Sequence, residues 1–549
     1  MESKNRKQNF LTGAAILSVS TIIVKIIGMF YKIPLKGIIG DAGYAYFNAA
    51  YSIYSVLLVI STTGLPVAMS RMVSEAHTLG NGRQMKRIFH TALIAYLSIG
   101  LLGTAVMMLL PNFLAGTVMG LPNASYSIFA LGPAVVFICF ASAGRGFFQG
   151  QGDMKPTAVS QIIEAAGKLI LGLGFAWLVM RQFGDEALSS GATIAGISVG
   201  AGCSALYALM KIRRSSKRID AMGGHALSYK TTAKRLLAIA IPITIGSAGL
   251  QLINLLDEVT VTHRMLTAAE SSGVMIDRVL ALTGGSDVQY AVENAKGIYA
   301  FAQTIFNLPI SLIPCITVAI IPAITSYLTL KDARGVKSTQ DSSMRIMSLI
   351  AMPCAVGLLV MAEPVMALLG GYEGDKLTLA GWLLALLTPT ILFNSVANMT
   401  TAVMQAHNHT VLPVVNTLIG GLLKVAVNYI LVGNPNIAIL GAPIGTFVCY
   451  LVIMLLNVFA MRRTLKEPPK LLPAIWRSGL AALVMGVVAY LVYGLLAKLI
   501  ASVALCCLGA IAVAVVVYLI LVILFKALTY EDCLLLPKGE KIAKLLRIR

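Results

Sequence analysis

The chain has 549 residues, of which 57% are hydrophobic and only 12% are charged, yet lysine and arginine exceed aspartate and glutamate by 20. An ordinary soluble domain is about 25% charged, and a soluble core stops growing near about 250–300 residues, so this composition excludes a soluble fold. It also excludes a disordered chain and a nucleic-acid-binding domain, whose basic residues would cluster on polar faces. We therefore expect an all-α integral membrane protein.

The apolar residues fall into segments that are long enough to span a membrane, since a helix needs about 20 of them to cross the hydrocarbon core. Fourteen such segments cover residues 10–31, 43–70, 86–110, 124–148, 156–180, 188–211, 232–256, 297–329, 343–369, 377–404, 410–432, 436–461, 472–497 and 500–528. The first is too long for the apolar region of a cleavable signal peptide and lacks a cleavage site, so we interpret it as the first span.

The basic residues alternate between the two sides of this predicted bundle. If the N-terminus lies inside and residues near span ends are counted with the adjoining segment, the inner segments hold 32 of the 43 lysines and arginines and the outer segments hold 8. The other three, Lys25, Lys168 and Lys424, lie within spans. Loops rich in lysine and arginine remain cytoplasmic, so the alternation predicts that both termini are cytoplasmic.

The sequence also repeats itself at an offset of 256 residues, set by aligning Pro66 with Pro322. At this offset Gln149 falls on Gln405, and two lysines within spans fall on each other. Apolar sequences always align to some degree, but paired glutamine, lysine and proline landmarks at one offset favour a true repeat. A parallel repeat of this kind is typical of transporters, in which the substrate site lies between two lobes.

The repeat predicts the domain organisation. We expect an N-terminal six-helix lobe over 1–225, ending in a basic cytoplasmic linker, and a C-terminal six-helix lobe over 226–465. An additional helix pair follows over 466–529, and a basic amphipathic cytoplasmic tail occupies 530–549.

Charged residues within the predicted spans are candidate substrate contacts, because a charge at mid-bilayer costs about 2.5–3.5 kcal/mol. Lys25 either faces the bundle interior or extends to the nearby interface. Glu164 and Lys168 are four residues apart on one helix face, as a self-neutralising pair or a functional one. Lys424, at the repeat-equivalent position of Lys168, has no carboxylate within one turn, so it is our first candidate for contact with an anionic substrate.

Other charges near span ends are candidates for gating or ion coupling. Arg145 either gates the inner mouth or anchors to lipid headgroups. Asp257 and Glu258 either bind a coupling cation or form an ordinary polar helix end. Arg71 and Glu75 form a further pair four residues apart, which we interpret as structural.

Motifs for other kinds of chemistry are absent from the sequence. There is no G-x-x-x-x-G-K-[ST] loop, so we expect no ATP hydrolysis. The eight cysteines and six histidines lack metal-type spacing, and most cysteines lie in apolar runs as small buried residues.

Three sequence stretches resemble a known family. They are TGAAILSVSTIIVKIIGMFYKIPL, STTGLPVAMSRMVSE and, most specifically, RGFFQGQGDMKPTAVSQIIE. They are similar to the polysaccharide-transport branch of the multidrug/oligosaccharidyl-lipid/polysaccharide (MOP) exporter superfamily, and within it to stage V sporulation protein B-like proteins and MurJ-type lipid II flippases. The resemblance covers essentially the whole chain.

This resemblance implies fourteen helices, in two six-helix lobes around a central cavity and a C-terminal pair. It implies a transporter, not an enzyme, that moves an undecaprenyl-pyrophosphate-linked precursor, lipid II first, to the outer leaflet by alternating access for peptidoglycan synthesis and cell shape. The location would be the bacterial cytoplasmic membrane. We expect a monomer in contact with membrane lipids, without nucleic acid, ATP or cofactor, and driven by a monovalent cation or the membrane potential.

The resemblance also bears on the site residues. Cationic residues on the first helix line the cavity of lipid II flippases, and Lys25 falls on one such position. The next cationic position holds Tyr31 here, and a second-helix arginine is replaced by an apolar residue near Ile53. The missing positive charge would come from Lys168, Lys424 or Arg264.

Other functions stay open at this point. The substrate is alternatively another lipid-linked unit of capsule, teichoic-acid or O-antigen type. A cation-coupled multidrug exporter of the same superfamily would need a buried carboxylate, for which Glu164 is the candidate. A membrane glycosyltransferase or polymerase would need outer carboxylates, such as Asp277, Asp287 and Glu293 in the predicted loop 263–296. A scaffold without transport does not explain interior lysines.

Overall fold

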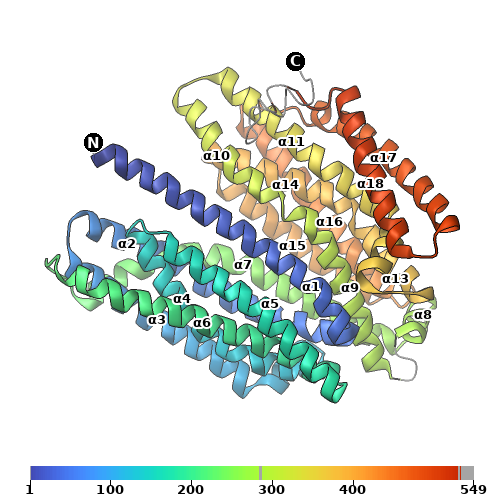
Figure 1. Ribbon diagram of the computed structural model, residues 1–549, viewed down its shortest axis with the longest axis horizontal. Helices are drawn as coiled ribbons and strands as arrows, with labels where there is room; N and C mark the ends of the chain where they lie inside the picture. Colours follow the sequence, from blue (N-terminus) through green and yellow to red (C-terminus); the bar gives the residue numbers. More distant parts are fainter. Residues whose placement is uncertain (1, 284–286, 530–531, 533–549) are drawn as a thin grey trace. The chain divides into compact units, whose positions relative to one another are not determined.

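The computed structural model describes residues 2–283, 287–529 and 532, and within them every regular element is a helix (Figure 1). This confirms the predicted all-α class. The physical reason is that helices and closed barrels alone satisfy their backbone hydrogen bonds within lipid. In the described part, 12 helices are long and apolar enough to cross a membrane. The protein is therefore a multi-pass membrane protein, and the count of fourteen crossings stays a prediction.

The helices group into two compact units. The first consists of Met1–Leu266 and Val292–Gly297, and the second of Thr267–Ala291 and Ile298–Arg549. The predicted lobe boundaries at 225 and 465 stay predictions. The predicted tail over 530–549 lies outside the described residues except for Asp532.

Seven long helices begin in the first unit. They are α1 (Glu2–Thr62), α2 (Gly64–Thr78), α3 (Gly82–Leu109), α4 (Ser125–Gly150), α5 (Lys155–Phe183), α6 (Glu186–Asp220) and α7 (Tyr229–Ala269). A π-helical segment, Phe113–Val118, and a 3₁₀ turn, Pro122–Ala124, connect α3 to α4.

The second unit contains most of the remaining helices. They are α8 (Val274–Thr283), α9 (Val288–Ile310), α10 (Ile313–Thr329), α11 (Ala333–Val360), α12 (Ala362–Gly370), α13 (Gly374–Leu387), α14 (Pro389–Ala406), α15 (Val411–Val432), α16 (Gly441–Thr464), α17 (Leu471–Leu499) and α18 (Val503–Leu524). The predicted outer loop over 263–296 is thus largely helical. Helix α7 extends into it as far as Ala269, and α8 and the start of α9 lie within it.

Helix α1 bends sharply at Gly40, where φ is 73° and ψ is −174°. Its 61 residues would extend about 90 Å at 1.5 Å per residue, three times the hydrocarbon thickness, so a straight helix does not fit a bilayer. A Cβ atom at Gly40 would lie 2.0 Å from Glu186 Oε1, so this corner requires glycine. The helix continues past residue 31, the predicted end of the first span, up to the bend.

Matching helices pack in matching pairs within each unit. In the first unit, α2 packs on α3 and α4, α3 on α4, α4 on α6, and α5 on α6. In the second unit, α10 packs on α11 and α14, α11 on α14, α14 on α16, and α15 on α16. An offset of 256 residues relates these helices, so the packing agrees with the internal repeat in the sequence.

The C-terminal helices α17 and α18 pack against each other, and α17 packs on α11 (Figure 1). Ser478 on α17 donates a hydrogen bond to Ser348 on α11 at 2.9 Å, and the Tyr518 hydroxyl on α18 donates to the Leu349 carbonyl at 3.0 Å. Beyond α18, Asp532 forms a buried ion pair with Arg345 at 2.7 Å. The additional helix pair of the predicted fold is confirmed.

Glycines set the distance between α5 and α6. A Cβ atom at Gly167 would lie 2.5 Å from the Gly200 Cα atom, and one at Gly196 would lie 2.5 Å from the Gly172 nitrogen. Small residues at membrane-helix interfaces allow the backbones to approach, and this approach provides the packing contacts.

We predict that Gly167→Ala lowers the midpoint of thermal unfolding, because the added methyl group meets backbone that must move, at a cost of about 1–3 kcal/mol. Gly174 lies on the same helix, and a Cβ atom there meets nothing within 4 Å. Gly174→Ala is therefore the matched control, and we expect an unchanged or higher midpoint. Equal effects of both substitutions on the purified protein in detergent would contradict this account of the interface.

Candidate functional site

Lys168 lies on α5 among tyrosine side chains of α1. Its Nζ atom donates a hydrogen bond to the Tyr51 hydroxyl at 3.1 Å. The same atom lies 4.4 Å from the centroid of the Tyr51 ring and 5.5 Å from that of Tyr31. The half-buried ammonium group is therefore stabilised by one hydroxyl and by the faces of two aromatic rings.

A row of aromatic side chains extends from this lysine along the second arm of α1. Tyr44, Phe47, Tyr51 and Tyr54 recur every three or four residues, which places them on one helix face. Neighbouring ring centroids in this row lie 5.6–6.2 Å apart. Tyr31, from the first arm of α1, is fully buried against Phe47, and its hydroxyl has no hydrogen-bond partner among the described residues. Beside the row there is thus a buried polar atom that can still accept or donate a hydrogen bond.

A second lysine, Lys32, lies near enough to Lys168 for the two positive charges to repel each other. Within residues 2–283, 287–529 and 532, neither lysine has a carboxylate partner. Lys32 was not among the predicted site residues, because the predicted first span ended at residue 31. If the helix continues, Lys25, Lys32 and Lys36 fall at i, i+7 and i+11 on one face, which is the signal that would have identified it.

Arg145 forms an ion pair with Glu164, the carboxylate that spacing had paired with Lys168. Its Nη2 atom forms an ion pair with Glu164 Oε2 at 2.7 Å and donates to Ser204 at 3.1 Å, and its Nε atom donates to Ser160 at 2.7 Å. The predicted pair of Glu164 with Lys168 was therefore wrong. Arg145 is only 12% exposed and joins α4 to α5 and α6, so the structure shows a contact between helices where we expected a gate or headgroup anchor.

A second pair predicted from spacing was also wrong. Glu75 on α2 forms an ion pair with Arg235 on α7 at 2.8 Å, whereas Arg71 is exposed. Arg87 on α3 lies 3.8 Å from the centroid of the Tyr229 ring at the start of α7. These contacts attach the start of α7 to α2 and α3, in agreement with the structural role that we expected for Glu75.

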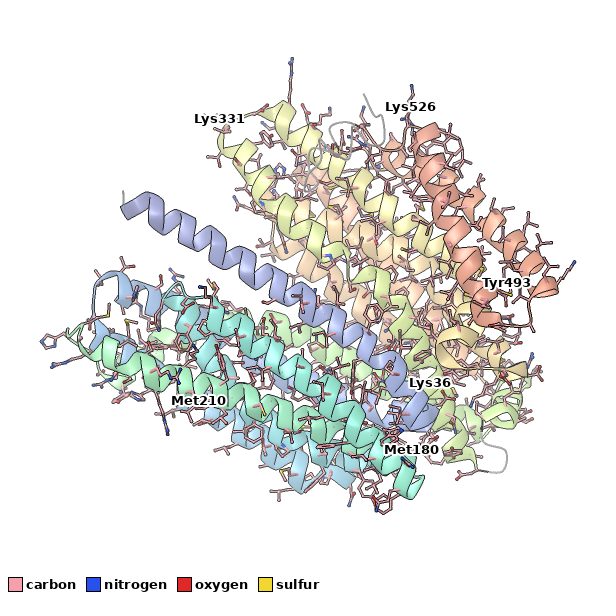
Figure 2. The ribbon with its side chains drawn as sticks, viewed as in Figure 1. Lys36, Met180, Met210, Lys331, Tyr493 and Lys526 are labelled. Carbon is pink, nitrogen blue, oxygen red and sulfur yellow. The ribbon has the colours of Figure 1, made fainter. Side chains whose placement is uncertain are left out.

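Further buried ion pairs lie near the bend of α1 and at the α7–α9 contact of the first unit. Lys36 pairs with Asp41 at 3.3 Å beside the bend (Figure 2). Lys296, only 2% exposed, pairs with Glu258 at 2.8 Å and donates to Thr262. The sequence analysis placed Lys36 and Lys296 in exposed outer segments, and nothing in the local sequence indicates their burial.

Two buried acidic residues accompany these pairs. Glu293 accepts a hydrogen bond from the Tyr46 hydroxyl and is 1% exposed, and Asp257 is 6% exposed. A role in cation coupling for Asp257 and Glu258 stays a prediction.

The remaining predicted residues do not join the Lys168 cluster in the contacts of the first unit. Lys25 is exposed on the first arm of α1, and Arg264 is half-buried on α7. Lys424 is half-buried on α15 of the second unit. Their contacts with a substrate stay predictions.

The carboxylates considered for enzyme chemistry are held in separate contacts. Asp287 caps α9 by accepting from the Tyr290 backbone nitrogen at 3.1 Å, and Asp277 accepts from Ser272 at 3.1 Å. Glu293 accepts from Tyr46. Over the residues whose placement is described, no group of three or more histidine, cysteine, aspartate or glutamate side chains could hold a metal ion. The arrangement around Lys168 instead suits binding of an anion.

Comparisons with known proteins agree with this fold. The family model described as "Polysaccharide biosynthesis protein" matches residues 10–328, and the MatE model matches residues 293–430. Stage V sporulation protein B of Bacillus subtilis is 24% identical over 539 residues, covering 97% of this chain and 98% of that protein. Lipid II flippase MurJ of the same organism is 25% identical over 467 residues, covering 82% of each. A solved structure of lipid II flippase MurJ in an inward closed conformation superposes with a TM-score of 0.67 at 14% identity, covering 93% of this chain and 98% of that one.

We predict that free energies of unfolding reveal which cation pairs with Glu164. Arg145→Ala and Glu164→Ala should each lower the free energy of unfolding, because either change alone leaves a charge unpaired. The decrease in the double variant should differ from the sum of the two single decreases by about 1–3 kcal/mol. Glu164→Ala and Lys168→Ala should add to within about 0.5 kcal/mol. Denaturant unfolding in detergent measures both cycles, and a larger coupling of Glu164 to Lys168 than to Arg145 would refute the assigned pairing.

Proposed function

Because the chain belongs to the polysaccharide biosynthesis protein family, in the MOP exporter superfamily, we propose that it is a flippase for a lipid-linked sugar precursor. Its substrate is an undecaprenyl-pyrophosphate-linked cell-wall precursor, lipid II first, which moves from the inner to the outer leaflet by alternating access. The relatives named above include a lipid II flippase, and this supports the substrate class.

One observation carries the proposal: Lys168, held by tyrosines inside the helix bundle, is not neutralised by Glu164. A charge within the membrane span is costly, and it is retained where it has a function. Lys32 adds a second positive charge nearby. Two cations that lack carboxylate partners favour a ligand with negative charge.

A pyrophosphate matches this site in charge and in hydrogen bonding. It carries about two negative charges at neutral pH, and each phosphate oxygen accepts charge-assisted hydrogen bonds that are about twice as strong as neutral ones. Lys168 donates to one phosphate, and the unpartnered Tyr31 hydroxyl and the Tyr51 hydroxyl are further donors beside it. The tyrosine rings also keep the ammonium group in place before the ligand arrives, which reduces the cost of ordering it.

The other predicted cations belong to the same proposal. Lys25 lies about two turns before Lys32 on the same face of α1 and would meet the anion first. Lys424, at the repeat-equivalent position of Lys168, and Arg264 supply positive charge when the carrier changes state. The chain lies in the bacterial cytoplasmic membrane with both termini cytoplasmic, as the distribution of basic residues supports. An inside-negative potential assists outward movement of an anion by about 2.3 kcal/mol per net charge per 100 mV.

A cation-coupled drug exporter is the second candidate, favoured by the match of residues 293–430 to the MatE model. Such a carrier needs a carboxylate that binds and releases a cation. The first candidate for that role, Glu164, is bound by Arg145 at 2.7 Å, so a guanidinium already occupies the place of the coupling cation. This contact weighs against the exporter.

We predict that the purified chain, reconstituted in proteoliposomes, moves lipid II across the bilayer and that Lys168→Ala slows this movement about tenfold or more. The reason is the loss of one charge-assisted bond to phosphate, since about 1.4 kcal/mol corresponds to a factor of ten. Lys32→Ala should act in the same direction. Accessibility of the lipid to an enzyme outside the vesicles measures the rate.

The matched control is Lys498→Ala, which removes an exposed lysine from the end of α17 and should leave the rate unchanged. Wild-type protein that fails to move lipid II but moves another pyrophosphate-linked sugar would restrict the substrate. Transport of cationic drugs alone, with Lys168→Ala at the wild-type rate, would replace the proposal with the exporter.

A further inference from the structure

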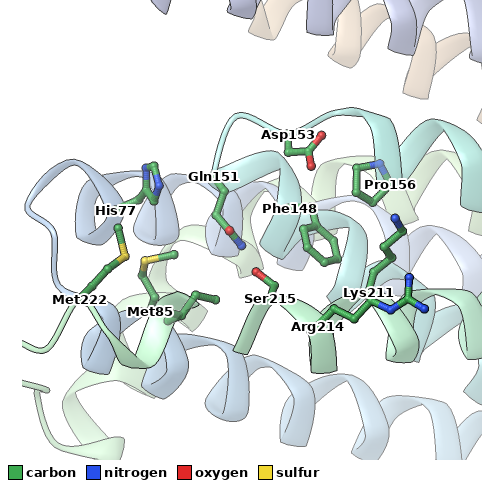
Figure 3. A pocket seen from close by; sticks show the side chains of 11 residues that line it. His77, Met85, Phe148, Gln151, Asp153, Pro156, Lys211, Arg214, Ser215 and Met222 are labelled. Carbon is green, nitrogen blue, oxygen red and sulfur yellow. The ribbon is translucent and has the colours of Figure 1, made fainter. Parts of the chain in front are cut away.

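A pocket in the first unit lies apart from the residues used above. Its volume is about 490 Å³, and it opens among the α2–α3 turn, the α4–α5 turn, the end of α6 and the segment after α6 (Figure 3). All of these turns belong to the predicted inner end of the unit. Pockets of about 300–1,000 Å³ are of the size that holds small ligands and headgroups.

The wall formed by the segment after α6 is fixed by hydrogen bonds. Asn81 Nδ2 donates to the His225 carbonyl at 2.6 Å, and the Leu227 nitrogen donates to Gln84 Oε1 at 2.7 Å. Asn81 also accepts from the Gln84 nitrogen at 3.0 Å and so caps α3. This wall is therefore preformed, and a ligand would not have to order it.

Lys211 and Arg214 place two positive charges at one end of the pocket, against the single carboxylate of Asp153 in its lining (Figure 3). In the part of the chain that the structure describes, neither has an ion-pair partner, and Lys211 Nζ lies 5.7 Å from the centroid of the Tyr207 ring. The carboxylate that lines the pocket, Asp153, accepts a hydrogen bond from the Lys155 backbone nitrogen at 3.1 Å. Asp153 thus stabilises the start of α5, and the two cations still exceed it by one positive charge in the pocket lining.

Neutral donors and apolar side chains complete the lining. The Gln151 and Ser215 side chains approach the hollow from opposite sides, and His77 lies at the end away from Lys211 (Figure 3). Buried Phe148 and Met85 form apolar lining. This combination suits a ligand with two parts. The polar side chains would surround its anionic group, and the apolar side chains would contact a less polar remainder.

The second unit contains a pocket of about 360 Å³ at the repeat-equivalent place, with different chemistry. At the offset of 256 residues Lys211 falls on Glu467, which pairs with Lys337 at 3.3 Å. Gln151 falls on His407, whose pKa is lowered by burial and, to a smaller extent, by the charge of His409. A carboxylate thus occupies the position of Lys211, and the cations among the described lining residues are three lysines, Lys331, Lys337 and Lys466, without an arginine that could form two parallel bonds to a phosphate.

We propose that the pocket of the first unit binds a phosphate-bearing headgroup of net negative charge, at a site separate from Lys168. Arg214 is suited to two parallel bonds to phosphate oxygens and Lys211 to a point-charge contact. Ser215 and Gln151 donate to the remaining oxygens. A phosphate ester of this kind belongs either to an anionic phospholipid of the surrounding leaflet or to a soluble phosphorylated compound.

The test is native mass spectrometry of the purified full-length chain with three probes. They are dioleoyl phosphatidylglycerol, dioleoyl phosphatidylcholine and sn-glycerol 3-phosphate. We expect wild-type protein to retain phosphatidylglycerol in preference to phosphatidylcholine, and Lys211→Gln/Arg214→Gln to retain it at least tenfold less. Displacement of the lipid by glycerol 3-phosphate would assign the site to a soluble phosphate ester, and no displacement would assign it to the lipid.

The matched control is Lys331→Gln/Lys466→Gln, which removes two lysines from the pocket of the second unit and the same total charge. We expect it to retain phosphatidylglycerol as the wild type does. Equal losses in the two double variants would overturn the proposal, as would equal retention of phosphatidylcholine by the wild type. Arg214→Gln alone changes an exposed residue, so it provides the same comparison if the double variant does not fold.

Discussion

The ion pair between Arg145 and Glu164 decides which charge in the first unit is left for a ligand. In an apolar bundle a charge must be paired, be solvated or bind a ligand of opposite charge, because its desolvation is costly. Arg145 takes the carboxylate four residues before Lys168 and adds hydrogen bonds to α5 and α6. Among the described residues, Lys168 contacts the Tyr51 hydroxyl and the rings of Tyr51 and Tyr31, and these do not cancel its charge.

Helix α1 brings the rest of this site together. Its bend at Gly40 allows both arms to contribute, Tyr31 and Lys32 from the first and the aromatic row from the second. The bend itself requires a glycine beside Glu186, and the Lys36–Asp41 pair lies next to it. The element that forms the candidate site is thus held by buried polar contacts at its corner, and packing of α5 on α6 through glycines keeps Lys168 near it.

The sequence predicted the helices well and the charge pairs poorly, and both outcomes have a physical reason. A span is a local property, since twenty apolar residues suffice to identify it. Ion pairs depend on which helices pack together. Spacing suggested that Glu164 pairs with Lys168 and Glu75 with Arg71. In the structure Glu164 pairs with a residue 19 positions away, and Glu75 pairs with a residue 160 positions away. Lys32 was missed because the first span was predicted to end at residue 31, whereas the helix continues to Gly40. Burial of Lys296 follows only from its contact with α7.

The most direct test of the central claim, that Lys168 binds a pyrophosphate because Glu164 does not neutralise it, is a comparison of two ligands. Binding of undecaprenyl pyrophosphate and of undecaprenyl monophosphate is measured for the wild type and for Lys168→Gln, with the purified protein in detergent. The account predicts that the wild type prefers the pyrophosphate about tenfold or more and that the variant loses this preference. An undiminished preference in a correctly folded variant would contradict it.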